Sequence, residues 1–105
     1  MLEKTVENYL VRQCKRYGGV AEKFTSPGKR GVPDRICSWP YGHKDWVECK
    51  APDGCLKKDQ VRDHIRRRNM GHSVFVCWSR EDVDKYIADC IKRNEIHAII
   101  KRASA

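Results

Sequence analysis

Residues 34–51 read DRICSWPYGHKDWVECKA and predict the hairpin on which the fold is built. Two strand-like runs, 34–39 and 44–51, flank a turn-forming segment at positions 40–43 that contains proline and glycine. The turn centre falls near Tyr41. Asp34 and Glu48 are equally far from that position, so we expect them to face each other with Cβ atoms roughly 4.5 to 5.5 Å apart.

A pair of facing carboxylates predicts a cation site. They repel each other and raise one pKa unless a cation lies between them, and hard oxygen ligands at this spacing suit Mg²⁺ or Mn²⁺ better than zinc. Lys50 lies two residues beyond Glu48 and projects to the same face, whereas Cys49 points into the core. Metal-bound water beside a lysine is suited to phosphodiester hydrolysis. The alternative for these residues is an ordinary surface ion-pair cluster.

Ahead of the hairpin, apolar residues at three- and four-residue spacing predict a first helix. It runs from Leu2 to Tyr17 and ends at Gly18-Gly19. A short strand over 20–25 follows, and then a basic, turn-rich loop over 26–33.

After the hairpin, helical spacing over 57–70 ends at Gly71 and places Val61, His64, Ile65 and Arg68 near one face. A buried strand over 73–78 and a last helix through Cys90, opened by a Ser79-x-x-Asp82 capping box, complete the pattern. The apolar patch 96–100 either packs or serves a second subunit. The element order α-β-β-β-α-β-α predicts one α/β domain over 1–105, with a mixed sheet flanked by helices.

Composition favours a polyanionic partner. The 105 residues include 22 Lys and Arg against 14 Asp and Glu, a formal charge of +8, although a merely soluble basic protein is the alternative. No run approaches the roughly 20 apolar residues that span a bilayer, so we expect a cytoplasmic protein of a bacterial or phage-infected cell. The six cysteines lack paired CxxC spacing and are expected to be reduced, mostly buried thiols without a zinc site.

Three segments in order resemble the signatures of a known family. Gly31-Val32-Pro33-Asp34-Arg35, Val47-Glu48-Cys49-Lys50-Ala51-Pro52 and Gln60 resemble the VRR-NUC branch of the PD-(D/E)XK nuclease superfamily, over residues 3 to about 87. The bare superfamily motif is degenerate, whereas this ordered set is specific. The resemblance implies a restriction-endonuclease-like α-β-β-β-α-β core with a C-terminal helix added.

The resemblance also implies roles for individual residues. Asp34 and Glu48 would bind Mg²⁺ or Mn²⁺ together with the main-chain carbonyl of Cys49, a position where the family usually has an aliphatic residue. Lys50 would orient or activate the attacking water, and Gln60 would support the site. A glutamate of the first helix would complete the metal environment, directly or through water. Glu7 is preferred for this role, Glu3 competes, and a solvated helix face is the alternative for both.

Basic residues near these motifs are candidates for contact with DNA phosphates. They are Lys23, Lys29, Arg30 and Arg35 beside the site, and Arg66, Arg67 and Arg68 on the second long helix, for which a solvated helix face is an equal alternative. Trp39, Trp46 and Trp78 are assigned no binding role, because aromatic residues in strands are more often core.

The expected activity is structure-selective cleavage of branched, Holliday-junction-like DNA, because a minimal domain without a sequence-reading module has few means of base-specific recognition. Similarity to junction resolvases implies a homodimer. The alternative is a non-catalytic DNA-binding module that retains the nuclease fold. The complete set of Asp34, Glu48, Lys50 and Gln60 argues against it, since a binding module does not need clustered acids facing a polyanion.

Overall fold

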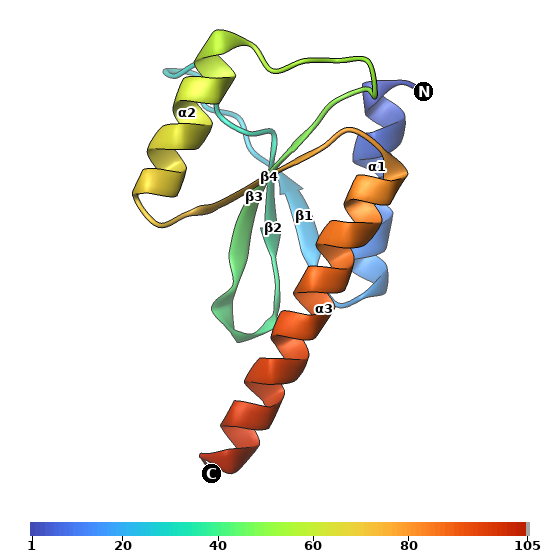
Figure 1. Cartoon of the computed structure of the whole chain (residues 1–105), viewed down its shortest axis with the longest axis vertical. Helices are drawn as coiled ribbons and strands as arrows, with labels where there is room; N and C mark the ends of the chain where they lie inside the picture. Colours follow the sequence, from blue (N-terminus) through green and yellow to red (C-terminus); the bar gives the residue numbers. More distant parts are fainter. Residues whose placement is uncertain (105) are drawn as a thin grey trace.

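Four strands form one mixed sheet in the order β1-β2-β3-β4 in the computed structural model, which describes residues 1–104. The elements are α1 (Glu3–Arg16), β1 (Val20–Lys23), β2 (Arg35–Ser38), the 3-10 turn η1 (Pro40–Gly42), β3 (Lys44–Cys49), α2 (Lys58–Asn69), β4 (Ser73–Cys77) and α3 (Arg80–Ala103) (Figure 1). The first three strands are antiparallel, and β4 pairs parallel to β3. The predicted α/β order with a C-terminal helix is confirmed.

The central hairpin has the predicted register. Ile36 pairs with Trp46 and Arg35 with Val47, so paired residues are equidistant from position 41. Tyr41 and Gly42 both have positive φ, 64° and 78°, which closes the turn. The strands are shorter than predicted by one or two residues at each outer end, so Asp34 lies just before β2.

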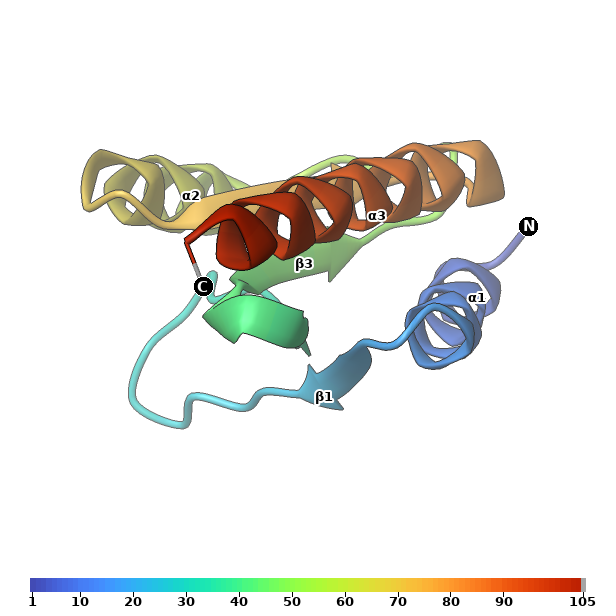
Figure 2. The same ribbon diagram turned by 90° about the horizontal axis from the view of Figure 1, so that it is seen from below.

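Side chains of α1 and α3 cover one face of the sheet, and these two helices lie side by side (Figures 1 and 2). On this face the alternate residues Val47 and Cys49 of β3 are buried. They pack into one apolar core with Val6, Leu10 and Cys14 of α1 and Val83, Tyr86, Ile87 and Cys90 of α3. Helix α2 packs along β4, away from these helices. The intervening β3 residues, including Trp46 and Glu48, therefore face away from α1 and α3.

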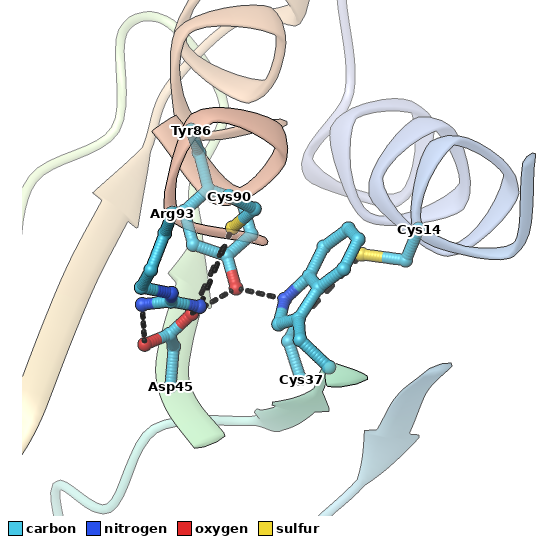
Figure 3. Close-up of polar contacts among 7 residues, drawn as sticks. Cys14, Cys37, Asp45, Tyr86, Cys90 and Arg93 are labelled. Atoms are coloured by element: carbon cyan, nitrogen blue, oxygen red, sulfur yellow. Dashed lines mark hydrogen bonds and ion pairs between the residues drawn. The ribbon is translucent and has the colours of Figure 1, made fainter. Parts of the chain in front are cut away.

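A buried polar cluster anchors α3 to β3 beneath this core (Figure 3). The Asp45 carboxylate accepts hydrogen bonds from both terminal nitrogens of Arg93, at 3.1 and 3.0 Å, and from the Tyr86 hydroxyl at 2.6 Å. The Trp39 indole N–H donates to the same hydroxyl at 2.9 Å. The cluster satisfies a carboxylate that is only 1% exposed.

The predicted end of the last helix at Cys90 is wrong, because α3 continues to Ala103. The capping box is confirmed, since the Ser79 side chain accepts from the Asp82 N–H. Residues 91–103 contain neither glycine nor proline, and His97 packs against Tyr41 and His43 of the hairpin turn. Ile96, Ile99 and Ile100 are exposed, so the apolar patch does not pack within the chain.

Helix α2 turns inward only part of the face that the sequence spacing grouped together, because His64 of that group is buried but Val61 and Ile65 are not. Val61 and Ile65 are 40% and 52% exposed, whereas Asp63 and His64 are buried. Asp63 forms ion pairs with Arg66 and Arg67, its neighbours one turn later, which neutralise it. The inner face of α2 is therefore polar.

The six cysteines are all free thiols, and Cys55 is the exposed one. The prediction of mostly buried thiols is confirmed. None of the helices in residues 1–104 has the length and apolar character needed to cross a membrane.

Candidate active site

Asp34, Glu48 and Lys50 lie at the end of the hairpin opposite its turn. Asp34 immediately precedes β2, Glu48 is the fifth residue of β3, and Lys50 follows β3 directly. The Lys50 N–H donates to the Cys77 carbonyl at 2.9 Å, which holds this end of β3 beside β4. Asp34 and Lys50 are half-buried, and Glu48 is only 1% exposed. The structure therefore brings together the three residues around which the site was predicted.

Glu48 is a buried acid whose hydrogen bonding is incomplete. Its Oε1 atom has no hydrogen-bond partner among the described residues. Burial raises the pKa of Glu48 to about 8, the adjacent Asp34 carboxylate adds to this shift, and Lys50 opposes it. A buried carboxylate with a free oxygen is costly unless a cation or a proton compensates it.

The loop before Asp34 is held against the start of α2. Gly31 has φ of 81°, and a Cβ atom there would lie 2.3 Å from the Asp59 carbonyl oxygen, so only glycine fits. The adjoining Pro33 is fully buried. On the other side of the loop, the Phe24 N–H donates to the Asp34 carbonyl at 2.7 Å. These contacts fix the position of Asp34 relative to both β1 and α2.

Gln60 lies at this same contact, in the first turn of α2. Its side-chain oxygen accepts a hydrogen bond from the Lys57 N–H at 2.9 Å and so caps the helix. A Cβ atom on Gly31 would approach the Gln60 nitrogen to 2.9 Å. The start of α2, including the Gln60 backbone, therefore lies against the loop that carries Asp34, whereas the Gln60 side chain caps its own helix.

The two candidate glutamates of α1 occupy different surroundings. Glu7 is 7% exposed and accepts a hydrogen bond from the Arg35 guanidinium at 3.1 Å, and Lys23 lies 3.7 Å from the same oxygen. Glu3 is exposed at the start of α1, and its charge contributes to the raised pKa of Glu48. Sequence spacing favoured Glu7 and gave no sign of its pairing with Arg35, because that contact joins residues far apart in the chain.

The donor set suits a hard divalent cation with bound water. Asp34, Glu48 and the Cys49 carbonyl offer oxygen atoms only, and Mg²⁺ commonly takes one or two carboxylates and keeps several waters. Within residues 1–104, no three His, Cys, Asp or Glu side chains gather closely enough to hold a metal ion.

The predicted DNA-contacting cations divide into two groups. Lys29 and Arg30 are exposed in the loop before Asp34. Arg35, Arg66 and Arg67 are engaged within the protein, Arg35 with Glu7 and the others with Asp63. Lys23 is exposed and lies beside Glu7. Sequence alone could not distinguish these groups, since the distinction depends on which acid each cation meets in the fold.

Comparison with known proteins agrees with this geometry. The chain is 44% identical over 79 residues to "Putative nuclease p44" of Acyrthosiphon pisum secondary endosymbiont phage 1, covering 75% of this chain and 85% of that protein. A solved structure described as a VRR_NUC domain superposes with a TM-score of 0.76 at 33% identity, covering 82% of this chain and 94% of that one. No family model matches the sequence. With this relative and this structural neighbour, the predicted identity is confirmed, and the chain belongs to the VRR-NUC family of nucleases.

Proposed function

We propose that this protein is a Mg²⁺- or Mn²⁺-dependent endodeoxyribonuclease that selects branched DNA, such as a Holliday junction. The single observation that carries the metal-dependent chemistry is the buried Glu48 carboxylate, which faces Asp34 and has one oxygen without a partner. Within a nuclease family, such a pair is best explained as a cation site. The phage origin of the 44%-identical relative supports action in the cytoplasm of an infected bacterial cell.

The proposed chemistry divides among five residues. Asp34, Glu48 and the Cys49 carbonyl would hold the cation, which would supply Lewis-acid activation of water and of the phosphate. Lys50 projects from the end of β3 beside Glu48, where its ammonium orients the attacking water and neutralises developing negative charge on the phosphate. Gln60, which caps the helix lying against the loop that carries Asp34, would support the site.

DNA phosphates would be bound by the basic residues around this site. Lys29 and Arg30 are the foremost candidates because they are exposed in the loop next to Asp34. Lys23, Arg35, Arg66 and Arg67 retain positive charge near the site, although their ion pairs with Glu7 and Asp63 reduce their freedom to reach a phosphate.

The test is cleavage of a labelled four-way junction and of a linear duplex of equal length, in Mg²⁺, Mn²⁺ or EDTA. We expect metal-dependent cutting that favours the junction and is lost in Lys50→Ala. Lys15→Ala, an exposed lysine on α1, is the matched control and should cut like the parent. Tight binding without cutting of either substrate in either metal would support the rival, a DNA-binding module that retains the nuclease fold.

Glu7 is our proposed water-mediated contributor to the metal environment. Glu7→Gln should lower cleavage more than Glu3→Gln, with the difference shrinking as the Mn²⁺ concentration rises. Because Glu7 also pairs with Arg35, the variant must be compared with Arg35→Gln, which breaks the same ion pair. Equal losses of cleavage in Glu7→Gln and Arg35→Gln would show that Glu7 acts only by positioning Arg35. A larger loss of cleavage in Glu3→Gln than in Glu7→Gln would assign the water-mediated metal role to Glu3.

We propose that the active form is a homodimer joined through the C-terminal half of α3. Ile96 and Ile99 are exposed one turn apart on this helix. If two copies pair antiparallel about these isoleucines, Ile96 of each copy lies opposite Ile99 of the other, and the pairing covers exposed apolar side chains of both copies. Light scattering should give a dimer for the parent and a monomer for Ile99→Glu. Ile65→Glu, at a similarly exposed isoleucine on α2, should remain dimeric.

A further inference from the structure

A cavity of about 460 Å³ lies on the same sheet face as the candidate active site. Its walls include Trp46 of β3, Ile36 of β2, and Lys44, Gly42 and His72 around them. Trp46 pairs across the hairpin with Ile36, and the next residues on that face are Glu48 and Asp34. The cavity, which we call the platform pocket, therefore extends from Trp46, two residues along β3 from Glu48, towards the hairpin turn at Gly42.

Trp46 and His72 form one flat surface at the edge of this pocket. The Trp46 indole N–H donates to Nδ1 of His72 at 3.1 Å, and the two ring planes differ by only 4°. An indole N–H lies in the plane of its ring, so rings joined in this way, with centroids 6.4 Å apart, lie side by side and not face to face. The result is an aromatic plane wider than either ring, with its His72 end exposed.

Positive charge surrounds this plane. The Arg67 guanidinium lies over the Trp46 ring at 4.1 Å, where it is held by its ion pair with Asp63. Lys44 is exposed on the pocket wall. Asp45 contributes no free negative charge, because its carboxylate is bound to Arg93. Because Arg67 covers one face of Trp46, the part of the plane open to a base is the exposed His72 ring, and Lys44 on the pocket wall can hold a phosphate.

We propose that the platform pocket binds an unpaired nucleobase of the DNA strand whose phosphate lies at Asp34 and Glu48. This inference rests on the proposed nuclease function and extends it to the substrate. Two residues along a strand span about 6.6 to 6.8 Å, and stacked nucleotides rise about 3.4 Å each. The stacked base is therefore one or two nucleotides from the phosphate at the carboxylates. Such a site favours DNA with unpaired bases next to the cut, as at a branch point or an overhang.

The test uses a duplex with a short single-stranded overhang that carries 2-aminopurine at one position at a time, in EDTA so that no strand is cut. The parent should quench the fluorescence at one or two positions. His72→Ala should weaken binding of the overhang duplex by about 10-fold, within the range known for loss of one stacking contact. It should leave the affinity for a blunt duplex within about twofold, as expected where phosphate contacts alone hold the DNA. His72→Phe should retain both quenching and affinity.

Exposed Tyr17, at the end of α1, provides the matched control, and Tyr17→Ala should bind both duplexes like the parent. Trp46→Ala should show the larger loss on the overhang, provided that circular dichroism shows a native fold. Equal weakening of the two duplexes by His72→Ala, or quenching that does not depend on position, would overturn the pocket. Cleavage assays in Mg²⁺ or Mn²⁺ separate the two proposals. Position-specific quenching without any cutting would overturn the nuclease proposal and support the pocket. Cutting by the parent, together with parent-like DNA binding by His72→Ala, would support the nuclease proposal and overturn the pocket.

Discussion

Asp45 and Glu48 lie three residues apart on β3, and both are 1% exposed, but their surroundings are opposite. Asp45 faces α3 and accepts hydrogen bonds from Arg93 and Tyr86. Glu48 faces the other side of the sheet, beside a second carboxylate, with one oxygen unpartnered. A buried acid whose charge the fold itself compensates serves structure. One whose charge the fold leaves uncompensated is suited to a cation that arrives from solution.

Among the variants that test this difference between Asp45 and Glu48, Glu48→Gln should have the largest effect, a loss of cleavage. We expect cleavage to fall by about 100- to 1,000-fold or more, since one preorganised charged group at the reacting phosphate is removed. The melting temperature of the metal-free protein should stay equal or rise, because the cost of burying an ionisable carboxyl group, which must take up a proton on folding, is also removed. Junction cleavage and thermal melting in EDTA measure the two effects. A variant that melts well below the parent would assign Glu48 a structural role like that of Asp45.

Asp45→Asn should show the converse pattern. Removing one partner of a buried ion pair costs about 3 kcal/mol, which corresponds to a fall in melting temperature of about 12 °C in a domain of this size. Cleavage well below that temperature should stay near the parental rate. The double variant Asp45→Asn with Arg93→Gln should recover part of the lost stability, as measured in a double-mutant cycle by chemical denaturation. Additive losses would contradict the pairing.

The pH dependence of stability should report on Glu48. Folding raises the pKa of Glu48 from 4.5 to about 8, so between these values the folded chain holds a proton that the unfolded chain releases. The free energy of unfolding of the metal-free protein should therefore fall as pH rises from about 4.5 to 8. Melting curves in EDTA should show this decline in the parent and a weaker one in Glu48→Gln. Stabilisation by added Mg²⁺ should be larger at pH 8 than at pH 6, because the cation requires the ionised carboxylates.

The smallest expected effect concerns the cations around the site. Arg30→Ala should lower the slope of log affinity for DNA against log salt by about 1, as expected for the loss of one phosphate contact. Arg67→Ala should change that slope less, because Arg67 is already paired with Asp63. Fluorescence anisotropy at several salt concentrations would measure both slopes. A larger change in Arg67→Ala would show that its ion pair opens when DNA binds.

The placement of the candidate active-site residues on β3 was predictable because it depends on local rules. The turn at Tyr41 sets the hairpin register, and alternation along a strand places Glu48 and Lys50 on one face. The same rules predicted that Cys49 would be buried, which the structure confirms. The family was identified from the ordered motifs, because the residue spacing of the hairpin alone does not distinguish one family from another.

The structural side of the molecule was less predictable because its contacts join distant residues. The pairing of Asp45 with Arg93 spans 48 positions, and that of Glu7 with Arg35 spans 28. No local spacing indicates such partners. The length of α3 was missed because its continuation is supported by the contact of His97 with the hairpin turn. The flat surface formed by Trp46 and His72 was missed because it joins β3 to the residue before β4, 26 positions along the chain.

The distribution of the thiols makes the protein easy to label at one place. Burial raises the pKa of Cys77 and of Cys90 to about 12, so these buried thiols are poor nucleophiles at neutral pH. Cys55 is exposed in the loop between β3 and α2, a few residues beyond Lys50. A maleimide fluorophore should therefore react first at Cys55, beside the candidate active site. A single dye at that position would report DNA arrival in real time without any engineered cysteine.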